Sequence, residues 1–181
     1  ANGGSSVAVG DLAKASGEFS TAMGADTKAV GYESIALGKG SEARANISAA
    51  VGTRAITNGA SSVAFGSDVT ADGDNSVVIG SGSTASGMNS IVIGWESDAI
   101  GEDSIALGAQ STSDGYGAIA LGTGSTATGD GAVAVGVMSE TSATVAATGN
   151  TIAGKAYTFA GANPAAAFSV GNAGLVRQIQ T

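Results

Sequence analysis

The residues with the greatest capacity for chemistry are three aspartates in the run DVTADGDN, at residues 68–75. Carboxylates at this density are typical of calcium loops, yet the ligand order of an EF-hand and its terminal Glu are absent. The pair Glu102-Asp103 is the other acidic group of this kind. We therefore interpret both groups as solvated turn residues, and we expect no metal and no other cofactor.

The chain lacks the side chains on which most catalytic sites depend. Its 181 residues include no His and no Cys, which removes the usual general base, the commonest metal ligand and the thiolate nucleophile. The net charge is −8, and residues 55–154 contain ten acidic residues but no Lys or Arg. Because phosphate contacts need a basic surface, we expect no nucleic-acid partner. The protein is predicted not to be an enzyme.

No part of the sequence is suited to a membrane. No run approaches the roughly 20 apolar residues that a spanning helix needs, and the pattern of a signal peptide is absent from the N-terminus. We expect a mature fragment, or one whose targeting segments lie outside it, with no membrane contact within this chain.

A 14-residue repeat positions these side chains. Three and one residues before each repeat glycine, nearly every unit carries an apolar residue, and at the first of these positions it is mostly β-branched. Apolar columns two residues apart indicate a strand, and a second short strand follows five to seven residues after the glycine. We predict a stacked solenoid with the two large apolar columns as its core. The glycines are Gly10, Gly24, Gly38, Gly52, Gly66, Gly80, Gly94, Gly108, Gly122 and Gly136.

The other face of the first strand is small and never charged. Ala and Ser dominate the positions two and four residues before the glycine. A solvent face would tolerate Lys, Glu and Asp, so we interpret this face as packed against another chain. The candidate interface residues are Ser34, Ala36, Ser62, Ala64, Ser104 and Ala106.

The units centred on S-[VI]-A-[VIL]-G, such as residues 34–38 and 104–108, resemble the head repeats of trimeric autotransporter adhesins, the YadA-like surface proteins of Gram-negative bacteria. The resemblance implies an all-β fold, a left-handed parallel β-roll solenoid assembled as a homotrimer. It covers about residues 6–136.

The C-terminal run FSVGNAGLVRQIQT, residues 168–181, is similar to the neck that joins such heads to a coiled-coil stalk. We divide the chain into ten head coils over 1–136, a connecting insertion with a hairpin over 137–166, and the neck over 167–181. The resemblance implies a bacterial cell-surface location, with an outer-membrane anchor in a C-terminal region outside this chain. The matching neck residues are Ser169, Val170, Gly171, Gly174, Arg177, Gln178 and Ile179.

The resemblance implies a non-enzymatic adhesin head that attaches to host-cell receptors or to extracellular-matrix proteins such as collagen, fibronectin and laminin. Self-association in a biofilm and a purely structural spacer are the alternatives. Basic residues gather toward the N-terminus, and the single Trp follows a repeat glycine where other units have mostly small or polar residues. The candidate ligand contacts are Lys39, Arg44, Arg54 and Trp95.

Two other solenoid functions fit less well. Left-handed β-helix acyltransferases use coils of about 18 residues and typically a catalytic His, and this chain has neither. Ice-binding solenoids need an unbroken Thr array, whereas charged residues interrupt the column of Thr70, Thr84, Thr112 and Thr126.

Overall fold

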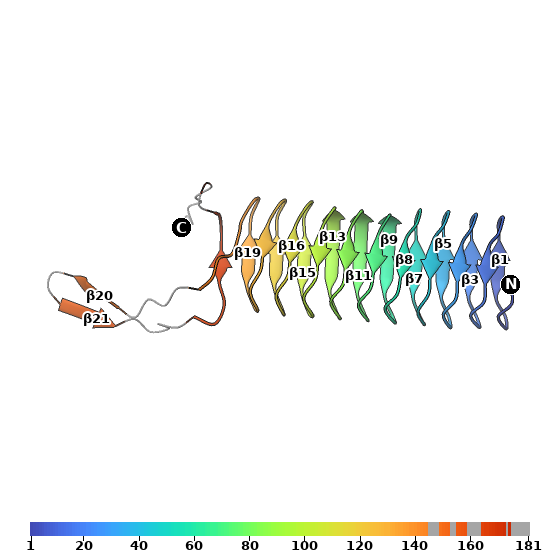
Figure 1. Cartoon of the computed structure of the whole chain (residues 1–181), viewed down its shortest axis with the longest axis horizontal. Helices are drawn as coiled ribbons and strands as arrows, with labels where there is room; N and C mark the ends of the chain where they lie inside the picture. Colours follow the sequence, from blue (N-terminus) through green and yellow to red (C-terminus); the bar gives the residue numbers. More distant parts are fainter. Residues whose placement is uncertain (145–148, 153–154, 159–163, 173, 175–181) are drawn as a thin grey trace, which may run out of the picture.

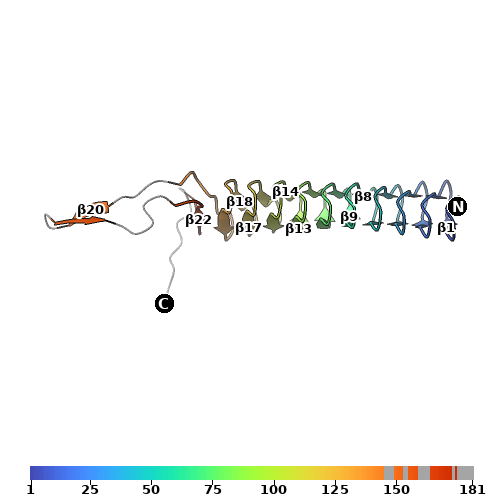
Figure 2. The ribbon, with the colours of Figure 1, turned by 90° about the horizontal axis from the view of Figure 1, so that it is seen from below.

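A straight rod of stacked coils forms most of the molecule (Figure 1). The computed structural model describes residues 1–144, 149–152, 155–158, 164–172 and 174, and these contain strands and turns but no helix. Seen from the side, two sheets lie face to face along the rod (Figure 2). The predicted all-β parallel solenoid is confirmed.

Each coil contributes one strand to each sheet, and every strand pairs in parallel with the equivalent strand one coil away. In the coils, each residue therefore lies opposite the residue 14 positions further on, as Val77 does with Ile91. The long-strand sheet contains β1 (Val7–Val9), β3 (Thr21–Met23), β5 (Ile35–Leu37), β7 (Ala49–Val51), β9 (Val63–Ser67), β11 (Val77–Ser81), β13 (Ile91–Trp95), β15 (Ile105–Leu107), β17 (Ile119–Leu121), β19 (Val133–Val135) and β22 (Phe168–Ser169). The short-strand sheet contains β2 (Lys14–Ala15), β4 (Lys28–Ala29), β6 (Glu42–Ala43), β8 (Ile56–Thr57), β10 (Thr70–Ala71), β12 (Thr84–Ala85), β14 (Asp98–Ala99), β16 (Thr112–Ser113) and β18 (Thr126–Ala127).

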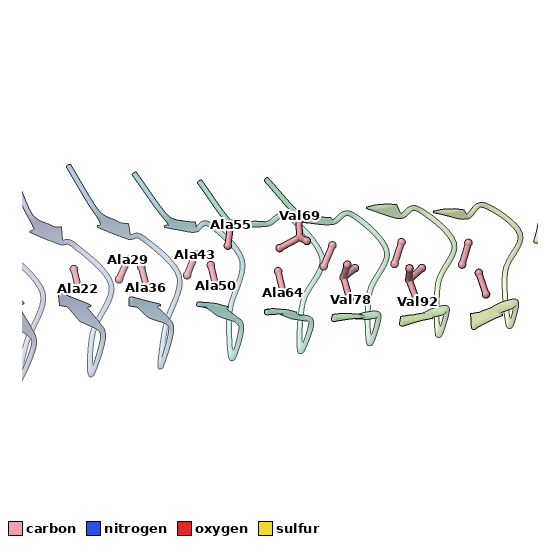
Figure 3. Close-up of a cluster of buried hydrophobic side chains, with 14 of the residues drawn as sticks. Ala22, Ala29, Ala36, Ala43, Ala50, Ala55, Ala64, Val69, Val78 and Val92 are labelled. Carbon is pink, nitrogen blue, oxygen red and sulfur yellow. The ribbon is translucent and has the colours of Figure 1, made fainter. Parts of the chain in front are cut away.

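The interior between the two sheets is filled by small side chains. Ala36, Ala50 and Ala64 of the long-strand sheet point toward alanines such as Ala43 of the short-strand sheet, and Val78 is among the largest buried side chains (Figure 3). The prediction that the large apolar columns form the core is therefore wrong. Side chains alternate across a strand, so the small face turned inward leaves the large apolar face outside.

The predicted chain-to-chain interface is wrong for the same reason. Ser34, Ala36, Ser62, Ala64, Ser104 and Ala106 are all 0% exposed within a single chain. They have no surface with which to contact another protomer, and their small size serves the close approach of the two sheets.

The backbone repeats every seven residues, which is half a coil. Residues with a φ between 49° and 68° recur at this interval from Ser5 to Met138. The half-coils share one seven-residue pattern. The first position is mostly small and usually Ser, the third is mostly Ala and the fifth is mostly Gly. The second, fourth and sixth positions vary, and the seventh has the left-handed conformation. The serine hydroxyls bond to the preceding turn, as when Ser20 Oγ donates to the carbonyl of Gly17 at 2.6 Å. The two sheets are thus built from the same local unit.

Each coil has two edges. The first edge connects a long strand to the following short strand, and the second edge connects that short strand to the next long strand. On the first edge, Gly66 has a φ of 145°, and a Cβ built there would lie 1.5 Å from the carbonyl oxygen of Gly80. Neighbouring coils approach so closely at this position that only glycine fits.

The coil geometry continues past the last repeat glycine. Glu140 bridges to Thr126 in the short-strand sheet, and Thr141 is 4% exposed. The antiparallel strands β20 (Gly149–Ile152) and β21 (Lys155–Thr158) then form a hairpin that lies beyond the last coil (Figure 1). The chain returns as β22, where Val133 of β19 pairs in parallel with Phe168.

Replacing Gly66 with Ala is expected to destabilise the rod by about 3 kcal/mol, because the Cβ meets a backbone carbonyl and the φ suits only glycine. The matched change is Gly117→Ala, where φ is 60° and no atom lies within 4 Å of the built Cβ. This second change should cost only about 1 to 2 kcal/mol, the ordinary penalty of a left-handed backbone for Ala. Urea unfolding of the two variants makes the comparison, and equal effects would contradict the close-approach explanation.

Candidate assembly and adhesion surfaces

The two sheets have similar interiors but different outer faces. The outward side chains of the short-strand sheet are mostly Lys, Glu, Asp, Asn, Ser and Thr. The outward side chains of the long-strand sheet include no charged residue over ten coils, and only Thr21 and Ala49 are not large and apolar. Because both sheets bury the same kind of small interior, the apolar outer face is not needed to build a coil.

The apolar outer face is also well exposed. The exposed fraction is 37% for Val63, 56% for Phe65 and 45% for Ile93. In the long strands, none of the twenty outward residues three and one positions before the repeat glycines is buried. Contiguous apolar patches on soluble proteins mark interaction sites. A face of this kind that runs the length of the rod has the character of an assembly interface.

Two of the basic candidate contacts, Arg54 and Arg44, form ion pairs, and that of Arg54 joins neighbouring coils. Arg54 forms a bidentate ion pair with Asp68, with 2.6 Å between Nη2 and Oδ2. On the short-strand sheet, Glu42 accepts hydrogen bonds from Lys28 Nζ and Arg44 Nε, both at 2.8 Å. The Arg54–Asp68 and Lys28–Glu42 pairs join adjacent coils and strengthen the stacking, whereas the Arg44–Glu42 pair lies within one coil, and both guanidinium groups remain at the surface.

The four candidate ligand contacts do not form one site. Lys39, Arg54 and Trp95 lie along the first edge, whereas Arg44 lies on the outer face of the short-strand sheet. Trp95 is 51% exposed, but it is four coils from Lys39, a separation of about 19 Å along the rod. The structure therefore brings Lys39 and Arg54 onto adjacent coils and leaves Trp95 apart.

The aspartates of residues 68–75 are separated by the fold. Asp68 pairs with Arg54, Asp72 Oδ1 accepts a bond from Asn58 Nδ2 at 2.6 Å, and Asp74 Oδ1 accepts one from the Ala60 amide at 2.8 Å. Among the described residues no group of three or more acidic side chains could hold a metal ion. These carboxylates serve as acceptors for the neighbouring coil.

The described neck residues cap the long-strand sheet. Ser169, Val170 and Gly171 occupy the places of the Ala-x-Gly positions in an eleventh coil, and the carbonyl of Gly171 accepts a bond from the Glu140 amide at 2.9 Å. The amide of Gly174 donates to Asn172 Oδ1 at 2.9 Å. The remaining neck candidates Arg177, Gln178 and Ile179 lie outside the described residues.

Comparison with known proteins is consistent with this arrangement. A family model described as the YadA head domain repeat (2 copies) matches residues 1–27, 15–41, 48–68, 71–97, 99–125, 113–137 and 127–153. The chain belongs to the YadA head-repeat family.

This YadA-type head is also similar to a solved structure, the collagen-binding domain of the Yersinia adhesin YadA. The TM-score is 0.64 and the sequence identity is 24%, over 97% of this chain and 86% of that one. The likeness is one of fold. No curated protein matches the chain. Among the described residues of this YadA-type head, no helix is long and apolar enough to span a membrane.

The seven-residue period was the signal that sequence reasoning missed. In both halves of the coil the residue two before the glycine is small, as Ala22 and Ala29 are, with Val78 and Val92 as the exceptions. A column shared by both halves must face the shared interior. Only the columns that differ between the halves, large and apolar in one and polar in the other, can face outward in this YadA-type head.

Lys28 and Arg44 lower the pKa of Glu42, mainly through the hydrogen bond from Lys28. A carboxylate with a lowered pKa stabilises the folded state above the pKa it has when unfolded, and this stabilisation is lost as the pH falls through the folded pKa. We expect Glu42→Gln to make the thermal midpoint fall less steeply from about pH 5 to pH 3. Asp98→Asn is the matched control, since Asp98 lies in the same column between Thr84 and Thr112. If the thermal midpoint depends on pH equally in the wild type and in Glu42→Gln, the lowered pKa of Glu42 does not stabilise the folded state.

Proposed function

We propose that the protein is the head of a bacterial surface adhesin and that it works as a homotrimer. The outer face of the long-strand sheet is the proposed contact between protomers. Its uncharged, exposed columns, with Ile79 41% and Leu121 42% exposed, are the observation that carries the proposal. Burying them removes a large apolar area from water.

Such a trimer turns the polar outer face of the short-strand sheet toward solvent in all three protomers. The proposed contact with a ligand is this surface, which includes Arg44. The exposed first-edge residues Lys39, Arg54 and Trp95 are proposed to belong to the same contact. The ligand class is an extracellular-matrix protein or a host-cell receptor. Collagen is the first candidate, because the similar Yersinia domain is described as collagen-binding. Three copies of a repeated surface would turn weak contacts into firm attachment by avidity.

As an adhesin head, the protein is proposed to lie on the cell surface and to have no catalytic activity. Residues 167–181 are proposed to continue into a stalk, with an outer-membrane anchor beyond it. The role of these residues as a neck is supported by the position of β22, which closes the long-strand sheet at the C-terminal end of the rod.

Assembly is tested by placing a charge on either outer face. Ile93→Asp introduces a carboxylate into the proposed interface, so the trimer should dissociate into folded monomers. Thr84→Asp is the matched control, because Asp98 occupies the equivalent place in the next coil, and it should remain trimeric. Sedimentation equilibrium gives the mass of each, and circular dichroism checks that each is folded.

Ala64→Glu completes the comparison. Ala64 is 0% exposed between the sheets, so the charge should unfold the coil and not merely separate protomers. A folded, trimeric Ile93→Asp variant would overturn the proposed interface. A folded, monomeric Ala64→Glu variant would instead favour the small face as the contact between chains.

Ligand binding is tested on immobilised fibrillar collagen. The chain is fused after Thr181 to a trimer-forming coiled coil, and its binding is compared with that of unfused, monomeric Ile93→Asp. Avidity predicts that the trimer binds about a hundredfold more tightly or better. Equal binding by the monomer would contradict avidity, and a folded trimer with no affinity for collagen would remove collagen from the proposal while leaving the assembly intact.

A further inference from the structure

The apolar outer face of the long-strand sheet has two gaps. Three residues before the repeat glycine, eight of the ten coils carry Val or Ile, whereas the coils of β3 and β7 carry Thr21 and Ala49. Thr21 has the shape of Val but carries a hydroxyl, and Ala49 is smaller than Val, so each interrupts the otherwise large and apolar column. Both gaps lie toward the N-terminal end of the rod (Figure 1).

Large apolar residues stand directly before these two gaps and nowhere else in the column. Phe19 precedes Thr21 by two residues, and Ile47 precedes Ala49 by the same interval. In the other eight coils the equivalent second-edge residue is polar or glycine: Ser5, Glu33, Ser61, Asn75, Asn89, Asp103, Gly117 and Gly131. The apolar surface that the face lacks at these positions is therefore present at its margin in the same two coils.

The backbone at these positions disfavours the residues that occupy them. Phe19 has a φ of 58° and Ile47 a φ of 57°. The left-handed conformation is suited to Gly, Asn and Asp and is unfavourable for bulky or β-branched residues. The sequence uses the better suited residues in this column from Asn75 onward, so the fold of a single chain does not require Phe19 or Ile47.

Both side chains are available to a neighbouring molecule. Phe19 is 49% exposed and Ile47 is 58% exposed. The ring of Phe19 meets the ring of Tyr32 edge to face, with 5.8 Å between centroids. This contact with the adjacent coil holds Phe19 at the border of the outer face.

We propose that Phe19 and Ile47 are interface residues of the assembled head, which supply against a second copy of this chain the apolar contact that Thr21 and Ala49 do not provide. The inference rests on the proposed trimer, since the occupant of the face is another protomer. It extends the interface from the long-strand sheet onto the second edge in these two coils. Continuity with the apolar face and the matched positions of gap and filler favour another protomer over an external ligand.

The test is a loss and a rescue within one coil. Phe19→Asn and Ile47→Asn introduce a residue that this column already uses, and each should raise the dissociation constant of the trimer on the order of a hundredfold, because three copies of the side chain are lost at once. Adding Thr21→Val to the first variant, or Ala49→Val to the second, should restore most of the affinity. Ser61→Asn is the matched control and should leave the constant unchanged. Sedimentation equilibrium of the full chain measures all five variants.

A second measurement separates this inference from a role within one chain. In the monomeric Ile93→Asp background, Phe19→Asn and Ile47→Asn should leave the thermal midpoint unchanged or higher, because the left-handed backbone is relieved. A lower thermal midpoint in that background would overturn the inference, because it would show that the side chains stabilise the single chain. An unchanged dissociation constant of the trimer, or a failure of the valine changes to restore it, would also overturn the inference. If Ile93→Asp itself stays trimeric, the proposed interface fails and this inference fails with it.

Discussion

The close approach of two sheets is the constraint on which the rest of the molecule depends. Each short coil can bury only what fits between strands that are almost in contact, so alanine and serine fill the interior. Each coil therefore gains little from its own core and depends on stacking against its neighbours. Hydrogen bonds, side-chain ladders such as Asn75 to Asn89 to Asp103, and glycines such as Gly66 all serve that stacking.

A thin interior also determines where the large apolar residues lie. With room inside for little more than Ala, Ser and a few valines such as Val78 and Val92, the other Val, Ile and Leu residues of the long-strand sheet lie outside, where a single chain leaves them in water. Assembly thus supplies the hydrophobic burial that an ordinary domain obtains within itself. Association is expected to add to the stability of a coil that already folds, since the apolar surface exposed on one protomer is the proposed contact with its copies.

The sequence predicted the architecture well but assigned the two faces of the long strands in reverse. Regular spacing of Gly10 to Gly136 was enough to predict parallel coils, because each position has an equivalent 14 residues away. Which face turns inward depends on the distance between sheets, and periodicity alone does not contain that distance. Hydrophobicity favoured residues such as Ile35 for the core, yet the small column of Ala36 was inside. The scattered surface candidates Lys39 and Trp95 could not be grouped without the coil geometry that separates them.

The excursion between β19 and β22 shows what the corners of this rod permit. Val133 pairs with Phe168, 35 residues away instead of 14, and the sheet continues without a shift in register. The chain leaves the rod after Thr141 and returns as the next strand of the sheet, so this corner accommodates an inserted segment between two stacked strands. A segment inserted at a corner therefore need not change the register of the coils on either side of it. The length of such a segment can vary while the rod itself stays the same.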